Sequence, residues 1–173
     1  MYLEKFIPTS YKKNVLDIDY KKLKSKGIKY ILFDLDNTLA SVKDNCFPKE
    51  IEKLLVKLSK DFKLIVVSNN FKRRIKPICD IIDIDFISFA MKPFTLKLNK
   101  KLTKYNISKE KTCIIGDQLI SDILVGNKLE TMTILVDPLS TDLKVTKFNR
   151  YLEKQILKKL KLRNALERGN YYE

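Results

Sequence analysis

The chain of 173 residues contains no histidine and no tryptophan, and it has only three cysteines, Cys46, Cys79 and Cys113. Structural and catalytic zinc sites use clustered histidine and cysteine ligands, and these three cysteines lack the close spacing of such ligands. An odd cysteine count, with Cys113 inside a predicted strand, is typical of reduced thiols. The absence of histidine also removes the base that a serine nucleophile such as Ser68 would need.

Long apolar runs are missing as well. No run approaches the roughly 20 residues that a membrane-spanning helix requires, and the first residues lack the apolar core of a secretory signal. We therefore expect a cytoplasmic protein. Glycine (4) and proline (5) are scarce, while 45% of the residues are hydrophobic. This composition and length predict one globular domain over residues 1–173.

The most informative stretch that is present reads YILFDLDNTL, from Tyr30 to Leu39. A short apolar run delivers Asp34 and Asp36 to its own carboxyl end, and Thr38 follows at once. In an open parallel sheet, ligands bind in the crevice beyond the carboxyl ends of the strands. The alternative is an ordinary turn, which aspartate and asparagine favour because they hydrogen-bond their own backbone.

The same pattern occurs three more times along the chain, where a further apolar run of strand length is followed by polar residues. Continuous rather than alternating hydrophobicity predicts strands that are covered on both faces, and the intervening segments have helical spacing. We therefore predict a three-layer, Rossmann-like α/β fold with about five parallel strands. The runs are Lys63–Val67 before Ser68-Asn69-Asn70, Phe86–Ala90 before Met91-Lys92-Pro93, and Thr112–Ile115 before Gly116-Asp117.

Carboxylates gathered at one edge of such a sheet repel one another, by about 4 kcal/mol for a pair 4 Å apart at an effective dielectric constant near 20. A positive charge must therefore lie among them. Magnesium prefers oxygen ligands and is commonly shared between one or two carboxylates and a substrate phosphate. The pattern predicts a Mg²⁺ site suited to phosphoryl transfer.

The order of these motifs resembles the haloacid dehalogenase (HAD)-like phosphatase superfamily. FDLDNTL is similar to its first motif, Ser68 to the second, Lys92 to the third, and Gly116-Asp117 with Asp122 to the fourth. The stretches VSNN, MKP and GDQLISD resemble the YqeG-type members of subfamily IIIA, which are similar to phosphatidylglycerophosphate phosphatases. The resemblance covers residues 27–138 and implies a phosphomonoester hydrolase.

The resemblance also implies roles for individual residues. Asp34 is the expected nucleophile, which forms an aspartyl-phosphate, and Asp36 the general acid and base. Lys92 would stabilise the nucleophile and the developing negative charge. Thr38, Ser68 and Asn69 would bind the phosphoryl group. The implied metal ligands are Asp34, Asp36 through its backbone carbonyl, Asp117 and Asp122.

These residues also have ordinary explanations that stay open at this point. Lys92 is one of very many lysines, and only its place between a strand end and Pro93 sets it apart. Asp122 follows Ser121 at an expected helix start, where an acidic side chain favours the positive end of the dipole. Asn69 could simply turn the chain.

Spacing indicates that the site is open. The interval from Thr38 to Ser68 is filled by a loop and one helix over residues 48–60, and the interval from Asn70 to Lys92 by one helix and a strand. Members of the resembling superfamily carry cap insertions at these two places, so this chain is expected to be capless. An open site suits a large or surface-bound substrate such as a lipid headgroup.

The ends of the chain are expected to flank this domain. Residues 1–27 are compatible with an extended piece and a short helix that ends near Gly27. Residues 141–165 are predicted to form a basic amphipathic helix, which either packs on its own domain or lies on an anionic membrane surface. Lysine and arginine total 35 against 21 acidic residues, a net charge of +14. This charge would attract anionic lipid, nucleic acid or phosphorylated substrates, but it also fits biased base composition.

The leading interpretation is a Mg²⁺-dependent phosphatase of phosphatidylglycerophosphate or a comparable headgroup. A soluble phosphorylated metabolite is the alternative substrate. A basic protein associated with nucleic acid or the ribosome, with a vestigial phosphatase site, is the alternative from a different class.

Overall fold

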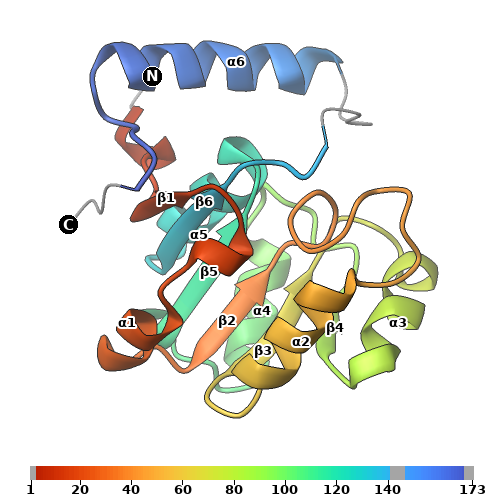
Figure 1. Cartoon of the computed structure of the whole chain (residues 1–173). Coiled ribbons are helices and arrows are strands. Elements are labelled where there is room, and N and C mark those ends of the chain that lie inside the picture. Colours follow the sequence, from red (N-terminus) through yellow and green to blue (C-terminus); the bar gives the residue numbers. More distant parts are fainter. Residues whose placement is uncertain (1–2, 141–146, 170–173) are drawn as a thin grey trace.

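The computed structural model describes residues 3–140 and 147–169 and contains one parallel sheet of six strands in the order β1-β6-β5-β2-β3-β4 (Figure 1). The order reverses around β2, which therefore lies in the middle of the sheet with β5 and β3 beside it. This is the arrangement in which ligands bind at the carboxyl edge. The strands are β1 (Ser10–Lys12), β2 (Tyr30–Phe33), β3 (Lys63–Val67), β4 (Asp85–Ile87), β5 (Thr112–Gly116) and β6 (Met132–Val136).

The predicted α/β class is confirmed, but the sheet has six strands rather than about five. The additional strand is β1, which lies in the segment expected only to flank the sheet and pairs with β6 in the register Ser10 to Ile134. Its three residues, Ser-Tyr-Lys, are too few and too polar to carry an apolar pattern. The run at 86–90 is also strand only as far as Ile87, because Phe89 turns into the left-handed region with φ 49°.

Helices cover both faces of the sheet, so that the sheet and the two groups of helices form three layers (Figure 1). The helices are α1 (Tyr20–Ser25), α2 (Lys49–Leu58), α3 (Lys72–Cys79), α4 (Leu96–Lys104), α5 (Leu124–Lys128) and α6 (Lys147–Leu162). The side chains of α1, α2 and α3 pack with Ile31 and Phe33 of β2, whereas those of α4 and α5 pack with Leu32. The period of two along a strand thus divides the core between the two faces.

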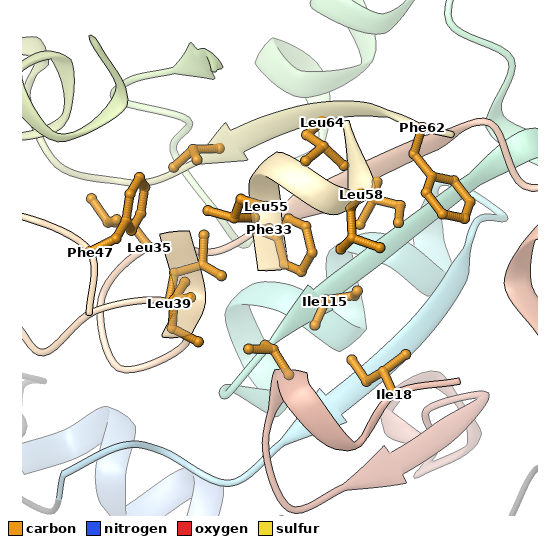
Figure 2. Close-up of a cluster of buried hydrophobic side chains, with 14 of the residues drawn as sticks. Ile18, Phe33, Leu35, Leu39, Phe47, Leu55, Leu58, Phe62, Leu64 and Ile115 are labelled. Carbon is orange, nitrogen blue, oxygen red and sulfur yellow. The ribbon is translucent and has the colours of Figure 1, made fainter. Parts of the chain in front are cut away.

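The helix α2 shows how the sequence specifies this packing. Ile51, Leu55 and Leu58 lie at helical spacing and are all buried. Figure 2 shows Leu55 and Leu58 close to Phe33 of β2. Each buried side chain of this size contributes about 1.5–3 kcal/mol relative to an exposed one. In the described chain, the connection from β2 to β3 consists of a loop, α2 and a short turn over residues 59–62, so no cap domain is inserted there.

The helix α6 covers part of the predicted C-terminal segment, of which residues 141–146 lie outside the described part. Its side chains Ile156 and Leu160 are buried against Leu3, Phe6 and Leu135. The apolar side of α6 therefore packs on its own domain, near the β1 and β6 end of the sheet. Among the described residues, no helix is both long enough and apolar enough to cross a membrane.

Candidate active site

Four neighbouring strands deliver the predicted motifs to one edge of the sheet. Asp34 follows β2, Ser68 follows β3, Asp117 follows β5, and Lys92 lies five residues beyond the end of β4. Because β5, β2, β3 and β4 are adjacent and parallel, their carboxyl ends meet. The convergence expected from the sequence is therefore present in the fold.

Lys92 lies at the centre of this edge. Its ammonium group contacts a carboxylate oxygen of Asp34 at 2.7 Å and one of Asp122 at 2.6 Å, and it donates to the backbone carbonyl of Val67 at 3.1 Å. The side chain of Lys92 is only 5% exposed, and that of Asp122 only 1%. Burial opposes the charged form of Lys92, but the carboxylates of Asp122 and Asp34 raise its pKa above the ordinary value. Lys92 is thus a fixed positive charge.

Three carboxylates share this small volume. Oxygen atoms of Asp34, Asp117 and Asp122 all lie within 4.8 Å of one another. Burial raises the pKa of Asp34 to about 7, although Lys92 acts in the opposite direction. Burial likewise raises the pKa of Asp117 well above its usual range, and the charges of Asp34 and Asp122 add to the effect. The single ammonium group of Lys92 does not balance these acids, so the site has room for a further cation.

Asp122 stabilises a helix start, as the ordinary explanation expects, but it also contacts Lys92. It lies in the first turn of the π-helix Leu119–Ile123, where one carboxylate oxygen accepts a hydrogen bond from the backbone N–H of the N-cap residue Gln118 at 3.1 Å. The other carboxylate oxygen contacts the Lys92 ammonium group at 2.6 Å. A Cβ atom on Gly116 would lie 2.3 Å from the Asp122 carboxyl carbon. Because the glycine leaves this space free, the Asp122 side chain reaches Lys92.

Asp36 points to a different set of partners. One carboxylate oxygen pairs with the Arg74 guanidinium at 3.0 Å, and the other accepts from the Asn70 side-chain amide at 2.6 Å. Its carboxylate is therefore outside the cluster of Asp34, Asp117 and Asp122. The predicted ligand atom of Asp36 was its backbone carbonyl, which this arrangement leaves unaffected.

The three predicted phosphate-binding residues lie near the cluster but have partners of their own. The Thr38 hydroxyl donates to Asp117 at 3.2 Å, and the Ser68 hydroxyl accepts from the backbone N–H of Asn70 at 3.1 Å. The Asn69 side chain accepts from the backbone N–H of Lys92 at 2.7 Å and donates to its carbonyl at 2.8 Å. Asn69 thus positions the Lys92 backbone, rather than simply turning its own chain.

Two residues with contacts at the site were not found from the sequence. Arg74 donates to Asp36 and to the backbone carbonyls of Ser41 and Val42 at 3.2 and 3.1 Å. In the sequence it is one of many basic residues, with no special spacing. Glu153 of α6 accepts from the backbone N–H of Ile120 at 3.1 Å, and burial raises its pKa to about 7. The sequence does contain a signal for Glu153, because it is a lone acidic residue among the lysines of an amphipathic helix.

We expect Arg74→Met to lower kcat about 10- to 100-fold with little change in KM for a soluble aryl phosphate, because Arg74 orients the Asp36 carboxylate and the loop beside it. Steady-state kinetics would measure this. Arg74→Lys should recover little, because a compact ammonium group cannot replace the guanidinium fork, whose two terminal nitrogens reach the Asp44 carbonyl and the Asp36 carboxylate separately.

The matched control is Lys76→Met, which removes an exposed cation from the same helix, where Lys76 pairs with Asp80. It should leave kcat unchanged. Equal losses from both variants would show that helix charge, and not the contact with Asp36, matters.

Comparison with known proteins identifies the relatives of this chain. Residues 89–160 match the family described as HAD-hydrolase-like, and residues 3–77 match the mitochondrial PGP phosphatase family. The probable phosphatase YqeG of Bacillus subtilis (strain 168) is 38% identical over 164 residues, which span 94% of this chain and 95% of that protein. The chain belongs to the HAD-type, YqeG-like phosphatases.

Solved structures share the fold of this YqeG-like phosphatase. An uncharacterised protein from Listeria monocytogenes serotype 4b has a TM-score of 0.54 at 18% identity, covering 78% of this chain and 99% of that one. A hypothetical protein from Xanthomonas campestris has a TM-score of 0.53 at 12% identity, covering 75% of each chain. The family match and the 38% identical relative show a HAD-type phosphatase. Members of this family use a divalent metal, and this chain contains an acidic cluster of Asp34, Asp117 and Asp122.

Proposed function

We propose that this protein is a Mg²⁺-dependent phosphomonoester hydrolase that works through an aspartyl-phosphate on Asp34. The observation that carries the proposal is the contact of the Lys92 ammonium group with both Asp34 and Asp122, beside the third carboxylate, Asp117. A nucleophilic carboxylate, a fixed cation and an excess of acidic oxygen ligands are what phosphoryl transfer needs.

The donor set fits Mg²⁺, which prefers oxygen ligands and is often shared with a phosphate. The carboxylates of Asp34, Asp117 and Asp122 and the backbone carbonyl of Asp36 are the proposed ligands. When bound, the ion supplies positive charge that offsets the repulsion between the carboxylates and the phosphate.

The protein groups account for the bond changes. A carboxylate oxygen of Asp34 attacks phosphorus, and the bond from phosphorus to the leaving alcohol oxygen breaks. The Asp36 carboxyl gives its proton to that oxygen. In the second step Asp36 takes a proton from water, the water oxygen attacks phosphorus, and Asp34 is released together with inorganic phosphate. Arg74 and Asn70 hold Asp36 in place, while Thr38, Ser68 and Asn69 line or position the phosphate site.

A phosphorylated lipid headgroup, phosphatidylglycerophosphate in the first place, is the proposed substrate. The match of residues 3–77 to the mitochondrial PGP phosphatase family supports it. The short connections between β2 and β3 and between β3 and β4 support it too, because in the described chain neither adds a cap over the site. A soluble phosphorylated metabolite is the alternative, and it suits the same groups.

The test is a panel of phosphate esters with Mg²⁺ and with a chelator. We expect Mg²⁺-dependent phosphate release from a generic aryl phosphate, and a higher kcat/KM for phosphatidylglycerophosphate in mixed micelles than for soluble sugar phosphates. Chelation should reduce every rate to background. A higher kcat/KM for one soluble ester would make that ester, and not the lipid, the substrate. Activity that persists without a divalent ion would overturn the proposed mechanism.

A further inference from the structure

Two loops beside the site expose large apolar side chains. Phe71 lies between β3 and α3, and the loop from β4 to α4 carries three more, with Leu96 at the start of α4. We call these residues the apolar loop surface. Their exposed fractions are Phe71 62%, Phe89 46%, Met91 48%, Phe94 68% and Leu96 83%. Apolar surface that is concentrated in this way marks an interaction site more often than scattered single residues do.

The two loops are held together as one structure. The backbone N–H of Phe89 donates to the carbonyl of Asn70 at 2.8 Å, and that of Ala90 donates to Ser68 at 3.0 Å. The rings of Phe71 and Phe89 stack with centroids 5.6 Å apart. Phe89 and Met91 both have left-handed backbones, with φ of 49° and 61°. Bulky residues rarely adopt this conformation, and it is typically kept where function requires it.

The two segments of the sequence that carry this surface are basic. Residues 62–79 and 86–109 contain no aspartate or glutamate, although they contain many lysines and arginines. Lys72 and Arg73, which follow Phe71, are exposed, and within the described part of the chain neither forms an ion pair. The Lys97 ammonium group lies over the Phe89 ring, 4.9 Å from its centroid. An apolar surface among unpaired cations complements an anionic bilayer.

We propose that the apolar loop surface docks this protein on an anionic membrane. The inference deepens the proposed function, because it rests on a lipid substrate at the same site. The loops that carry Phe71 and Phe89 also carry Asn69 and Lys92, so a docked surface presents the site to headgroups. The helix α6 is the other basic candidate, but its side chains Ile156 and Leu160 are already buried in its own domain.

The experiment is flotation of the full chain with vesicles of phosphatidylcholine alone, or of phosphatidylcholine mixed with phosphatidylglycerol. The protein should float only with the mixed vesicles, and less at high salt. The double variant Phe71→Ser with Phe94→Ser should weaken partitioning about tenfold or more, because two aromatic side chains are lost from the bilayer interface. Lys72→Glu with Arg73→Glu should abolish flotation with the mixed vesicles, because the charge that attracts anionic lipid is reversed.

The matched control places the same loss of apolar surface on α6, where Tyr151 and Leu162 are 62% and 75% exposed. Tyr151→Ser with Leu162→Ser should float like the wild type. Equal flotation of the Phe71/Phe94 and the Tyr151/Leu162 double variants would overturn the proposal, and so would loss of flotation in the Tyr151/Leu162 variant alone. The proposal would also be overturned if the protein did not bind vesicles but self-associated in a way that depends on Phe71 and Phe94. That result would assign the apolar loop surface to contact with a second copy of the chain.

Hydrolysis of a soluble aryl phosphate separates this inference from the proposed function. Phe71→Ser with Phe94→Ser and Tyr151→Ser with Leu162→Ser should both retain that activity and the wild-type unfolding temperature. Inactivity of all proteins together with Phe-dependent flotation would refute the enzyme and keep the docking surface. Normal activity with no flotation of the wild type would refute the docking surface and keep the enzyme.

Discussion

Asp34→Asn is expected to lower the rate of Mg²⁺-dependent hydrolysis of an aryl phosphate by more than about 10⁴-fold. The same substitution should stabilise the metal-free protein at about pH 8. Activity is lost because an amide cannot attack phosphorus as a carboxylate does. Stability is gained because the substitution removes a buried charge that the site must otherwise accommodate beside Asp117 and Asp122. Activity assays and thermal unfolding of the same samples measure the two effects.

The sign of the pH dependence follows from the pKa of Asp34, which burial raises from 3.8 to about 7. A carboxyl whose pKa is higher in the folded than in the unfolded state binds its proton more tightly when folded. Its contribution to stability is fully present below about pH 4 and is lost as the pH rises through about 7. The metal-free wild type should therefore lose stability between about pH 5 and about pH 8, and Asp34→Asn should lose less.

Magnesium should reverse this order, because an ion that binds only the folded state stabilises it. At about pH 8, Mg²⁺ should raise the unfolding temperature of the wild type more than that of Asp34→Asn. The control is Asp85→Asn, an exposed aspartate that pairs with Lys63 at the far end of the sheet. Retained turnover in Asp34→Asn would remove Asp34 as the nucleophile, and an unchanged response to Mg²⁺ would remove it as a ligand.

The sequence predicted the elements that have a strong local signal. The run Lys63–Val67 is a strand with the predicted bounds, because its residues 64–67 are continuously apolar and buried. The helix predicted over residues 48–60 is observed as Lys49–Leu58, because its buried leucines repeat at helical spacing. The strand β1 was missed because pairing with β6, and not its own composition, makes Ser10–Lys12 a strand.

Contacts at the site depended on information that no local pattern carries. The convergence of Asp34, Lys92 and Asp117 was an exception, because parallel strands place their carboxyl ends at one edge of the sheet. The contact between Asp36 and Arg74 depends on the orientation of α3 and the path of the loop at 41–45. The double hydrogen bond from Asn69 to the Lys92 backbone depends in the same way on how two loops approach each other. Side-chain direction between distant segments is a property of the packed fold.

Lys92→Met is expected to have the largest effect on stability. The substitution keeps most of the side-chain volume but leaves the carboxylates of Asp34 and Asp122 without the cation that contacts both. Removing one partner of a buried ion pair costs about 3–5 kcal/mol, because a charge stays buried without compensation. We expect a loss of this size for the metal-free protein at neutral pH, measured by denaturant unfolding, and loss of detectable phosphatase activity.

The dependence on acid and on metal distinguishes electrostatics from simple loss of packing. Lowering the pH should restore part of the stability of Lys92→Met, because the uncompensated carboxyl groups then take up protons. Mg²⁺ should also restore stability, but not activity, since the ion balances charge without replacing the ammonium group at Asp34. Lys100→Met, an exposed lysine of α4, is the control and should match the wild type. A loss that neither protons nor Mg²⁺ reduce would show that Lys92 acts through packing alone.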